Sequence, residues 1–182
     1  MAKIARKIRA RFFFAVEGES EQSFVKWLQG LADQQGLYVH LDIRPLGGGG
    51  YSSMLKQAGI FRERGLSNGR YKSSFLLVDE DRANSGDWSV EVLRQKASSQ
   101  NINVCLQRPN LEGLLLRMIL GKERSAPDAS GVMPQLVSAW PGYRKPMNAR
   151  DLEQKYSFND VARVANLEPD LLAMLKKIGL IQ

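Results

Sequence analysis

Apolar and polar residues follow two different periods along the first 120 positions of the chain. Short runs that are apolar or alternate in polarity predict four strands, at residues 12–16, 38–46, 73–81 and 102–109. Apolar residues spaced at i, i+3, i+4 and i+7 predict amphipathic helices after each strand. These helices are expected at residues 20–36, 52–65, 89–100 and 110–120.

Regular alternation of strands and helices is typical of βαβ units, and therefore of an α/β fold with a mostly parallel central sheet flanked by helices. Residues 1–124 are expected to form this domain, including a basic arm at its N-terminus. Residues 125–182 are expected to form a loop rich in proline and a small helical tail packed on the core. In the tail, one helix should begin near Ser157, and another should have Pro169 in its first turn and end at Gly179.

Several classes of protein are excluded by composition. No apolar run approaches the ~20 residues that cross a bilayer. The basic start leads into a strand that ends in an acid, which does not fit a signal peptide, so we expect a cytoplasmic protein without a membrane partner. The single cysteine, Cys105, excludes an internal disulfide and a cysteine-rich zinc site, and we expect its thiol to be buried in a strand.

The net charge of +7, from 26 basic and 19 acidic residues, favours a polyanionic partner such as DNA or RNA. The basic residues concentrate in three places along the chain. These are Lys3, Arg6, Lys7, Arg9 and Arg11; Arg62, Arg64, Arg70 and Lys72; and Arg144, Lys145 and Arg150.

Acidic residues follow three of the expected strands. Glu17 ends the first, Asp79 and Asp81 end the third, and Glu112 comes just after the fourth. Ligands of open parallel sheets bind beyond the carboxyl ends of the strands, so these acids should lie at one rim. Clustered carboxylates favour a hard divalent cation, Mg²⁺ or Mn²⁺. Alternatively, each acid is a helix-start or solvated loop residue.

The stretches "FAVEGESE" and "FLLVDEDRA" together resemble a Toprim domain, the Mg²⁺-binding α/β domain of topoisomerases, primases and several nucleases. "VEGESEQSFVKWL" is similar to the OLD-type and RloB-like branches, in which a second acid, here Glu21, follows the first. "QRPNLEGLLLRMI" is similar to the RloB-like segment that carries a glutamate, here Glu112. The resemblance covers roughly residues 10–120. It implies a metal-dependent nuclease, often of phage defence, that works with an ATPase partner.

Carried over by position, the resemblance makes Glu17 a general acid/base or metal ligand and makes Asp79 and Asp81 ligands of Mg²⁺. Glu21 and Glu112 would help to hold a second metal. Asp87 is a further candidate, although an aspartate before "WSVEVL" is also a natural helix cap.

The glycine run in "PLGGGGYSSM" precedes an expected helix. Gly48 and Gly49 would let the backbone approach a phosphate at the helix N-terminus. It is not a P-loop, because no Lys-Ser/Thr pair follows the glycines. The alternative is a flexible loop with Ser52 or Ser53 as the helix cap. Lys56 and Arg82 are candidates for phosphate contacts, or else solvated surface residues.

The single histidine, His40, excludes zinc chemistry of the HExxH type, and no GxSxG nucleophile elbow occurs. We expect His40 to be packed within its strand. We also expect Trp27 to lie in the core, whereas Trp88 and Trp140 either stack on bases or pack against the sheet.

The sequence therefore predicts a nuclease that cleaves phosphodiester bonds of DNA or RNA with Mg²⁺ or Mn²⁺. One alternative is a non-catalytic module that binds nucleic acid or regulates a partner. Another is a phosphoacceptor regulator on a similar sheet, but such proteins carry a lysine after a late strand, and "INVCLQRP" offers none.

Overall fold

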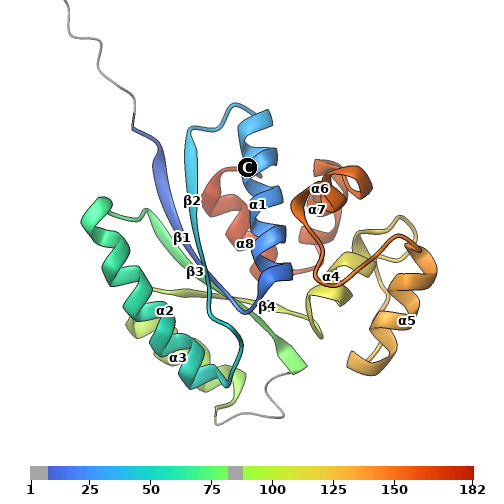
Figure 1. The fold of residues 1–182 in the computed structure, drawn as a ribbon, viewed down its shortest axis with the longest axis horizontal. Helices are drawn as coiled ribbons and strands as arrows, with labels where there is room; N and C mark the ends of the chain where they lie inside the picture. Colours follow the sequence, from blue (N-terminus) through green and yellow to red (C-terminus); the bar gives the residue numbers. More distant parts are fainter. Residues whose placement is uncertain (1–7, 82–87) are drawn as a thin grey trace, which may run out of the picture.

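The computed structural model describes residues 8–81 and 88–182, which form an α/β fold around a four-stranded parallel sheet (Figure 1). This confirms the predicted fold class. The strands, in the order β2-β1-β3-β4 across the sheet, are β1 (Ala10–Val16), β2 (Val39–Pro45), β3 (Ser73–Asp79) and β4 (Asn103–Gln107). The helices are α1 (Glu19–Gln34), α2 (Tyr51–Gly65), α3 (Val90–Ser99), α4 (Leu111–Met118), α5 (Ala129–Ala139), α6 (Ala149–Lys155), α7 (Phe158–Ala165) and α8 (Pro169–Ile178).

Successive side chains of β1 are divided between two apolar cores. Phe12 and Phe14 face one core, while Phe13 and Ala15 face the other. Because side chains alternate across a strand, an unbroken apolar run is needed where both faces of a sheet are covered. The run "FFFAV" is therefore the sequence signature of a strand buried on both faces.

Different helices cover the two faces of the sheet (Figure 1). Side chains of α2 and α3, such as Met54 and Leu93, pack on the face that carries Phe13. On the other face, side chains of α1 pack together with α4 and the C-terminal helices, where Leu152, Val161 and Leu171 share one apolar cluster. The tail thus contributes to the same core as the sheet.

The segment from residue 125 to 150 differs from the expected loop. It contains the helix α5 and ends at the start of α6. Pro134 lies inside α5, and proline within a helix normally indicates a helix end, so the sequence pattern concealed this element. Val132 and Leu136 are fully buried, so tertiary packing compensates for the missing amide hydrogen bond.

The helix caps lie slightly earlier than expected at two places. The first helix, expected from residue 20, begins at Glu19 with Gly18 as its N-cap, and the N-cap of α2 is Gly50 rather than Ser52 or Ser53. In the tail, Pro169 begins α8 and Gly179 ends it with a φ of 89°, as predicted.

Four expectations for single side chains are settled by burial. Trp27 and Cys105 are buried, as predicted. The expectation that His40 is packed was wrong. β2 is an edge strand with only one covered face. The side chains of Val39 and Leu41 are buried on that face, and His40 between them is exposed on the other. Trp140 is half-buried and packs against other aromatic rings, those of Tyr143 and Tyr156, rather than on the sheet.

Five basic or acidic residues singled out in the sequence lie outside the described residues. They are Lys3, Arg6, Lys7, Arg82 and Asp87. Of the remaining N-terminal basic residues, Arg11 is held within the protein, because its guanidinium donates to Asp42 and to the backbone oxygens of Gly65 and Gly69. Within residues 8–81 and 88–182, no helix is long and apolar enough to span a bilayer.

Candidate functional site

An open cavity of about 390 Å³ lies beyond the carboxyl end of β1. Three of the predicted acids, Glu17, Glu21 and Asp79, line it together with Gly48 and Lys145. We call it the acid pocket. Its walls come from the end of β1, the start of α1, the end of β3, the glycine loop and the segment before α6, which are distant in sequence.

Glu17 is held at the rim by its backbone and by its side chain. It directly follows β1, and its backbone oxygen accepts a hydrogen bond from Gly48 N at 3.0 Å. Its Oε2 lies 3.5 Å from Asp79 N, and the residue is 6% exposed. Glu21, in the first turn of α1, accepts from Gly18 N at 2.9 Å and thereby caps the helix. The turn at Gly18 therefore brings two acids of one short segment to the pocket.

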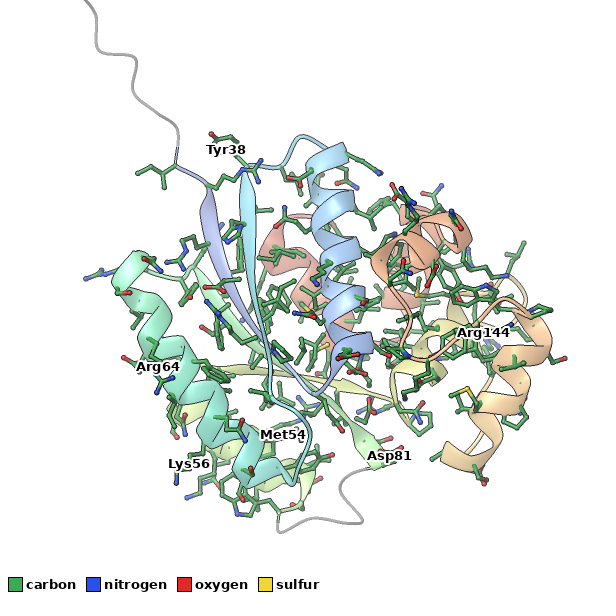
Figure 2. The ribbon with its side chains drawn as sticks, in the orientation of Figure 1. Tyr38, Met54, Lys56, Arg64, Asp81 and Arg144 are labelled. Atoms are coloured by element: carbon green, nitrogen blue, oxygen red, sulfur yellow. The ribbon has the colours of Figure 1, made fainter. Side chains whose placement is uncertain are left out.

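The two aspartates predicted at the end of the third strand, Asp79 and Asp81, line different cavities. Asp79 is the last residue of β3 and lines the acid pocket, but the chain leaves the extended conformation at Glu80. Asp81 lines a neighbouring cavity beside Pro109, where its Oδ2 accepts from Asn110 Nδ2 at 3.3 Å. The alternation that would align the two aspartates holds only for extended backbone. Figure 2 shows Asp81 just beyond the end of β3.

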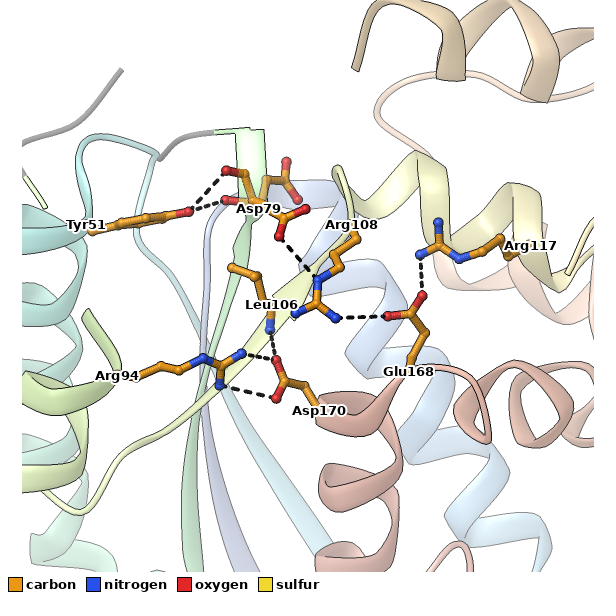
Figure 3. Close-up of polar contacts among 9 residues, drawn as sticks. Tyr51, Asp79, Arg94, Leu106, Arg108, Arg117, Glu168 and Asp170 are labelled. Atoms are coloured by element: carbon orange, nitrogen blue, oxygen red, sulfur yellow. Dashed lines mark hydrogen bonds and ion pairs between the residues drawn. The ribbon is translucent and has the colours of Figure 1, made fainter. Parts of the chain in front are cut away.

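Tyr51, the first residue of α2, fixes the backbone at this point. Its hydroxyl donates to Asp79 O at 2.8 Å, and its side chain is fully buried (Figure 3). Glu80 lines the neighbouring cavity with Asp81 rather than the acid pocket, and pairs with Arg108 at 3.2 Å. The carboxyl end of β3 is thus clamped from two sides.

Glu112 lies in the first turn of α4 and is 2% exposed. Its Oε1 accepts from Tyr143 Oη at 2.8 Å and lies 2.7 Å from Lys145 Nζ. Both partners come from the segment between α5 and α6. Lys145 therefore places a positive charge between Glu112 and the acid pocket.

The five acids influence one another electrostatically. Burial first, and then the charges of Glu21, Glu17, Asp81 and Glu112, raise the pKa of Asp79 to about 8. Burial also raises the pKa of Glu21, with smaller contributions from Glu17 and Glu112. Burial lowers the pKa of Lys145, but its bond to Glu112 and the neighbouring acids outweigh this and leave the pKa raised. The site therefore concentrates negative charge that a cation relieves.

The donors suit a divalent cation by chemistry, because carboxylate oxygens are the ligands that Mg²⁺ and Mn²⁺ prefer. Their present arrangement is not a preformed cage. Among the described residues, no three acidic, histidine or cysteine side chains are grouped closely enough to hold a metal ion. Glu21, Asp79 and Glu112 instead accept hydrogen bonds from Gly18 N, Leu111 N and Tyr143 Oη. Side-chain rotation would be needed to bring them onto a common ion.

The residues predicted to bind phosphate are divided between two places. Gly48 lines the acid pocket, whereas Lys56 lies on α2 outside it. Gly47, Gly48 and Gly49 have φ values of 75°, 80° and 115°, which side-chain-bearing residues rarely adopt. The run of glycines is thus required by the turn itself. The amide of Gly48 is already used by Glu17 O.

Sequence reasoning did not assign Tyr51, Tyr143 or Lys145 to the site. In the sequence, Lys145 stands out only as a member of a basic group. Tyr143 and Lys145 lie in a segment without apolar periodicity. No local pattern could show that they contact Glu112, which precedes Tyr143 by 31 residues.

Comparisons with protein-family models, curated proteins and solved structures find no match for this chain. The likeness to Toprim, OLD-type and RloB-like proteins therefore rests on the short stretches that carry it.

Proposed function

We propose that the protein is a Mg²⁺- or Mn²⁺-dependent nuclease that hydrolyses phosphodiester bonds of DNA or RNA. The observation that carries the proposal is the convergence of Glu17, Glu21 and Asp79 on one cavity at the carboxyl end of a parallel sheet. The raised pKa of Asp79 supports it, because strongly perturbed carboxyl groups in a cavity are typical of functional sites.

Glu17, Glu21 and Asp79 would hold the cation. Asp81, in the neighbouring cavity, and Glu112, paired with Lys145, would join a second one only after their side chains moved. A cation bound there would polarise the phosphodiester and favour attack by water. Asp79 holds a proton near neutral pH while the site is empty, so cation binding should release that proton. The ammonium group of Lys145, at the open side of the pocket, would attract a phosphate oxygen by charge.

The decisive experiment measures cleavage of labelled single- and double-stranded DNA and RNA by wild type and by Asp79→Asn, with Mg²⁺, Mn²⁺ or chelator. Asp33→Asn is the matched control, because Asp33 is an exposed residue near the end of α1. We expect metal-dependent cleavage by wild type and Asp33→Asn, and at least a hundredfold loss in Asp79→Asn. Mn²⁺ binding, followed by electron paramagnetic resonance, should weaken in parallel.

A second candidate function is supported by one observation. The acids accept hydrogen bonds from protein groups, and Glu112 is paired with Lys145, so the pocket is self-neutralised in part. This favours a module that binds nucleic acid without cutting it. Binding by wild type and Asp79→Asn alike, with no cleavage under any metal, would identify this function. A role in phage defence with an ATPase partner is a further proposal, carried by the family resemblance alone.

A further inference from the structure

A groove lies between α2 and α3, on the face of the sheet opposite α1. Its volume is about 800 Å³, larger than that of the acid pocket. One wall is formed by α2, the other by residues that flank α3, from Trp88 just before its start to Gln100 just after its end.

The α2 wall of this groove is basic. Lys56 and Arg64 line it, and both side chains are exposed and extend outward from α2 (Figure 2). The guanidinium of Arg62 already has partners within the protein, because it donates to Ser74 Oγ at 3.0 Å and forms an ion pair with Glu63 at 2.9 Å. The charges of Arg62 and Glu63 cancel, so Lys56 and Arg64 leave the wall positive. They are eight residues apart, which is about 12 Å along a helix.

The groove also offers flat apolar surface. Trp88 is half-buried, packs on the apolar core beneath α2 and α3, and lines the groove. Ile60, 44% exposed, adds apolar surface on the α2 wall. A positive groove with an aromatic surface fits a single strand of nucleic acid, whose phosphates follow the charges while an unpaired base stacks on the ring. A duplex fits less well, because its bases are already stacked.

The groove and the acid pocket are both lined by residues close to the start of α2. Gly48 lines the acid pocket, Ser52 lines the groove, and Tyr51 between them is bonded to Asp79 O. A single strand of nucleic acid that lies along α2 would therefore reach the acids near the N-terminus of α2.

We propose that the α2–α3 groove binds a single strand of DNA or RNA, with Lys56 and Arg64 contacting phosphates and Trp88 stacking on a base. This inference deepens the proposed function, on which it rests for its purpose, because it assigns the substrate as single-stranded. Binding itself can be measured without cleavage.

The test measures fluorescence anisotropy of labelled twelve-nucleotide dT and U strands, and of a matched duplex, in chelator. The variants are Lys56→Gln with Arg64→Gln, Trp88→Leu and Trp88→Phe. Lys26→Gln with Lys122→Gln is the control, since it removes the same charge from exposed positions outside the groove. We expect the groove charge variant to bind about tenfold more weakly, with a salt slope smaller by about 1.4, or about 0.7 for each lost contact.

Trp88→Leu should weaken binding by about tenfold, and Trp88→Phe should restore most of it by keeping an aromatic face. Unchanged affinity in the groove charge variant and in Trp88→Leu would overturn the proposal. So would equal affinity for the duplex, or equal competition by poly-glutamate, which would indicate an acidic peptide as the ligand.

The two proposals fail separately. If wild type never cleaves but the groove variants lose binding, the groove is supported and the nuclease is not. If wild type cleaves and the groove variants bind single strands with wild-type affinity, the nuclease proposal is supported and the groove proposal is refuted.

Discussion

Lys145 Nζ lies 2.7 Å from Glu112 Oε1, so an ammonium group from the segment before α6 contacts a deeply buried acid of the site. The contact joins residues that belong to the expected tail and to the expected α/β domain. It also gives the pocket a cation of its own, which any metal ion or phosphate has to accommodate.

Replacing this lysine should separate its two effects. In Lys145→Gln we expect cleavage to fall about a hundredfold, because a positive group that would face the phosphate is lost. We expect Mn²⁺ to bind more tightly, because no ammonium competes for Glu112. Lys122→Gln, at an exposed position, is the control for both measurements. Cleavage by Lys145→Gln at the wild-type rate would show that the ammonium group does not contact the substrate.

The stability of the metal-free protein should depend on pH through Asp79. In the folded protein this carboxyl has a pKa of about 8, against 3.8 for an ordinary aspartate, so between these values the folded state binds one proton more than the unfolded state. The free energy of unfolding must then fall as pH rises through this range. The raised pKa of Glu21 acts in the same direction.

We therefore expect the melting temperature in chelator to decrease from about pH 5 to about pH 8, and Asp79→Asn to flatten that decrease. Differential scanning calorimetry at several pH values provides the measurement. An equally steep decrease in Asp79→Asn would assign the dependence to other groups.

Asp170 should matter for stability because it binds two elements at once. At the start of α8 it accepts from Leu106 N at 3.1 Å on the edge strand β4 and from Arg94 Nη1 at 3.2 Å on α3 (Figure 3). We expect Asp170→Asn to lower the free energy of unfolding by about 2 kcal/mol, as for charge-assisted hydrogen bonds. Urea denaturation measures it.

Asp33→Asn is the matched control, since it changes a surface ion pair with Arg9 that is nearly half exposed on both sides. It should cost less than about 1 kcal/mol. Equal effects of the two substitutions would contradict the role of Asp170.

Gly113 should tolerate no side chain. A Cβ atom there would lie 2.6 Å from Arg108 O and 2.7 Å from Pro109 Cδ, so α4 could not start this close to the end of β4. We expect Gly113→Ala to lower the free energy of unfolding by about 1–3 kcal/mol. In Gly30→Ala, where nothing lies within 4 Å of the new Cβ, the same change inside α1 should stabilise by about 0.5–1 kcal/mol. Chemical denaturation of both variants measures these free energies of unfolding. A Gly113→Ala protein as stable as wild type would refute the predicted clash with Arg108 O and Pro109 Cδ.

Local patterns of the sequence were sufficient for the four strands in their succession along the chain and, within the described residues, for every helix except α5 and α6. The run from Phe12 to Val16 encodes a strand buried on both faces, and the spacing of Phe24, Leu28 and Leu31 encodes the buried face of α1. Local patterns were not sufficient for α5. Pro134 disfavours a helix at this point, and only the packing of Val132 and Leu136 in the core stabilises it.

The sequence by itself determined that Glu17 and Asp79 lie at the carboxyl ends of parallel strands, because apolar runs fix the strands and the topology fixes the shared rim. Only the tertiary structure decided what meets these acids. The turn at Glu80 moves Asp81 into the next cavity, and the segment before α6 brings Lys145 to Glu112. Periodicity reports how one segment is buried, whereas a contact between distant segments depends on how all the intervening elements pack.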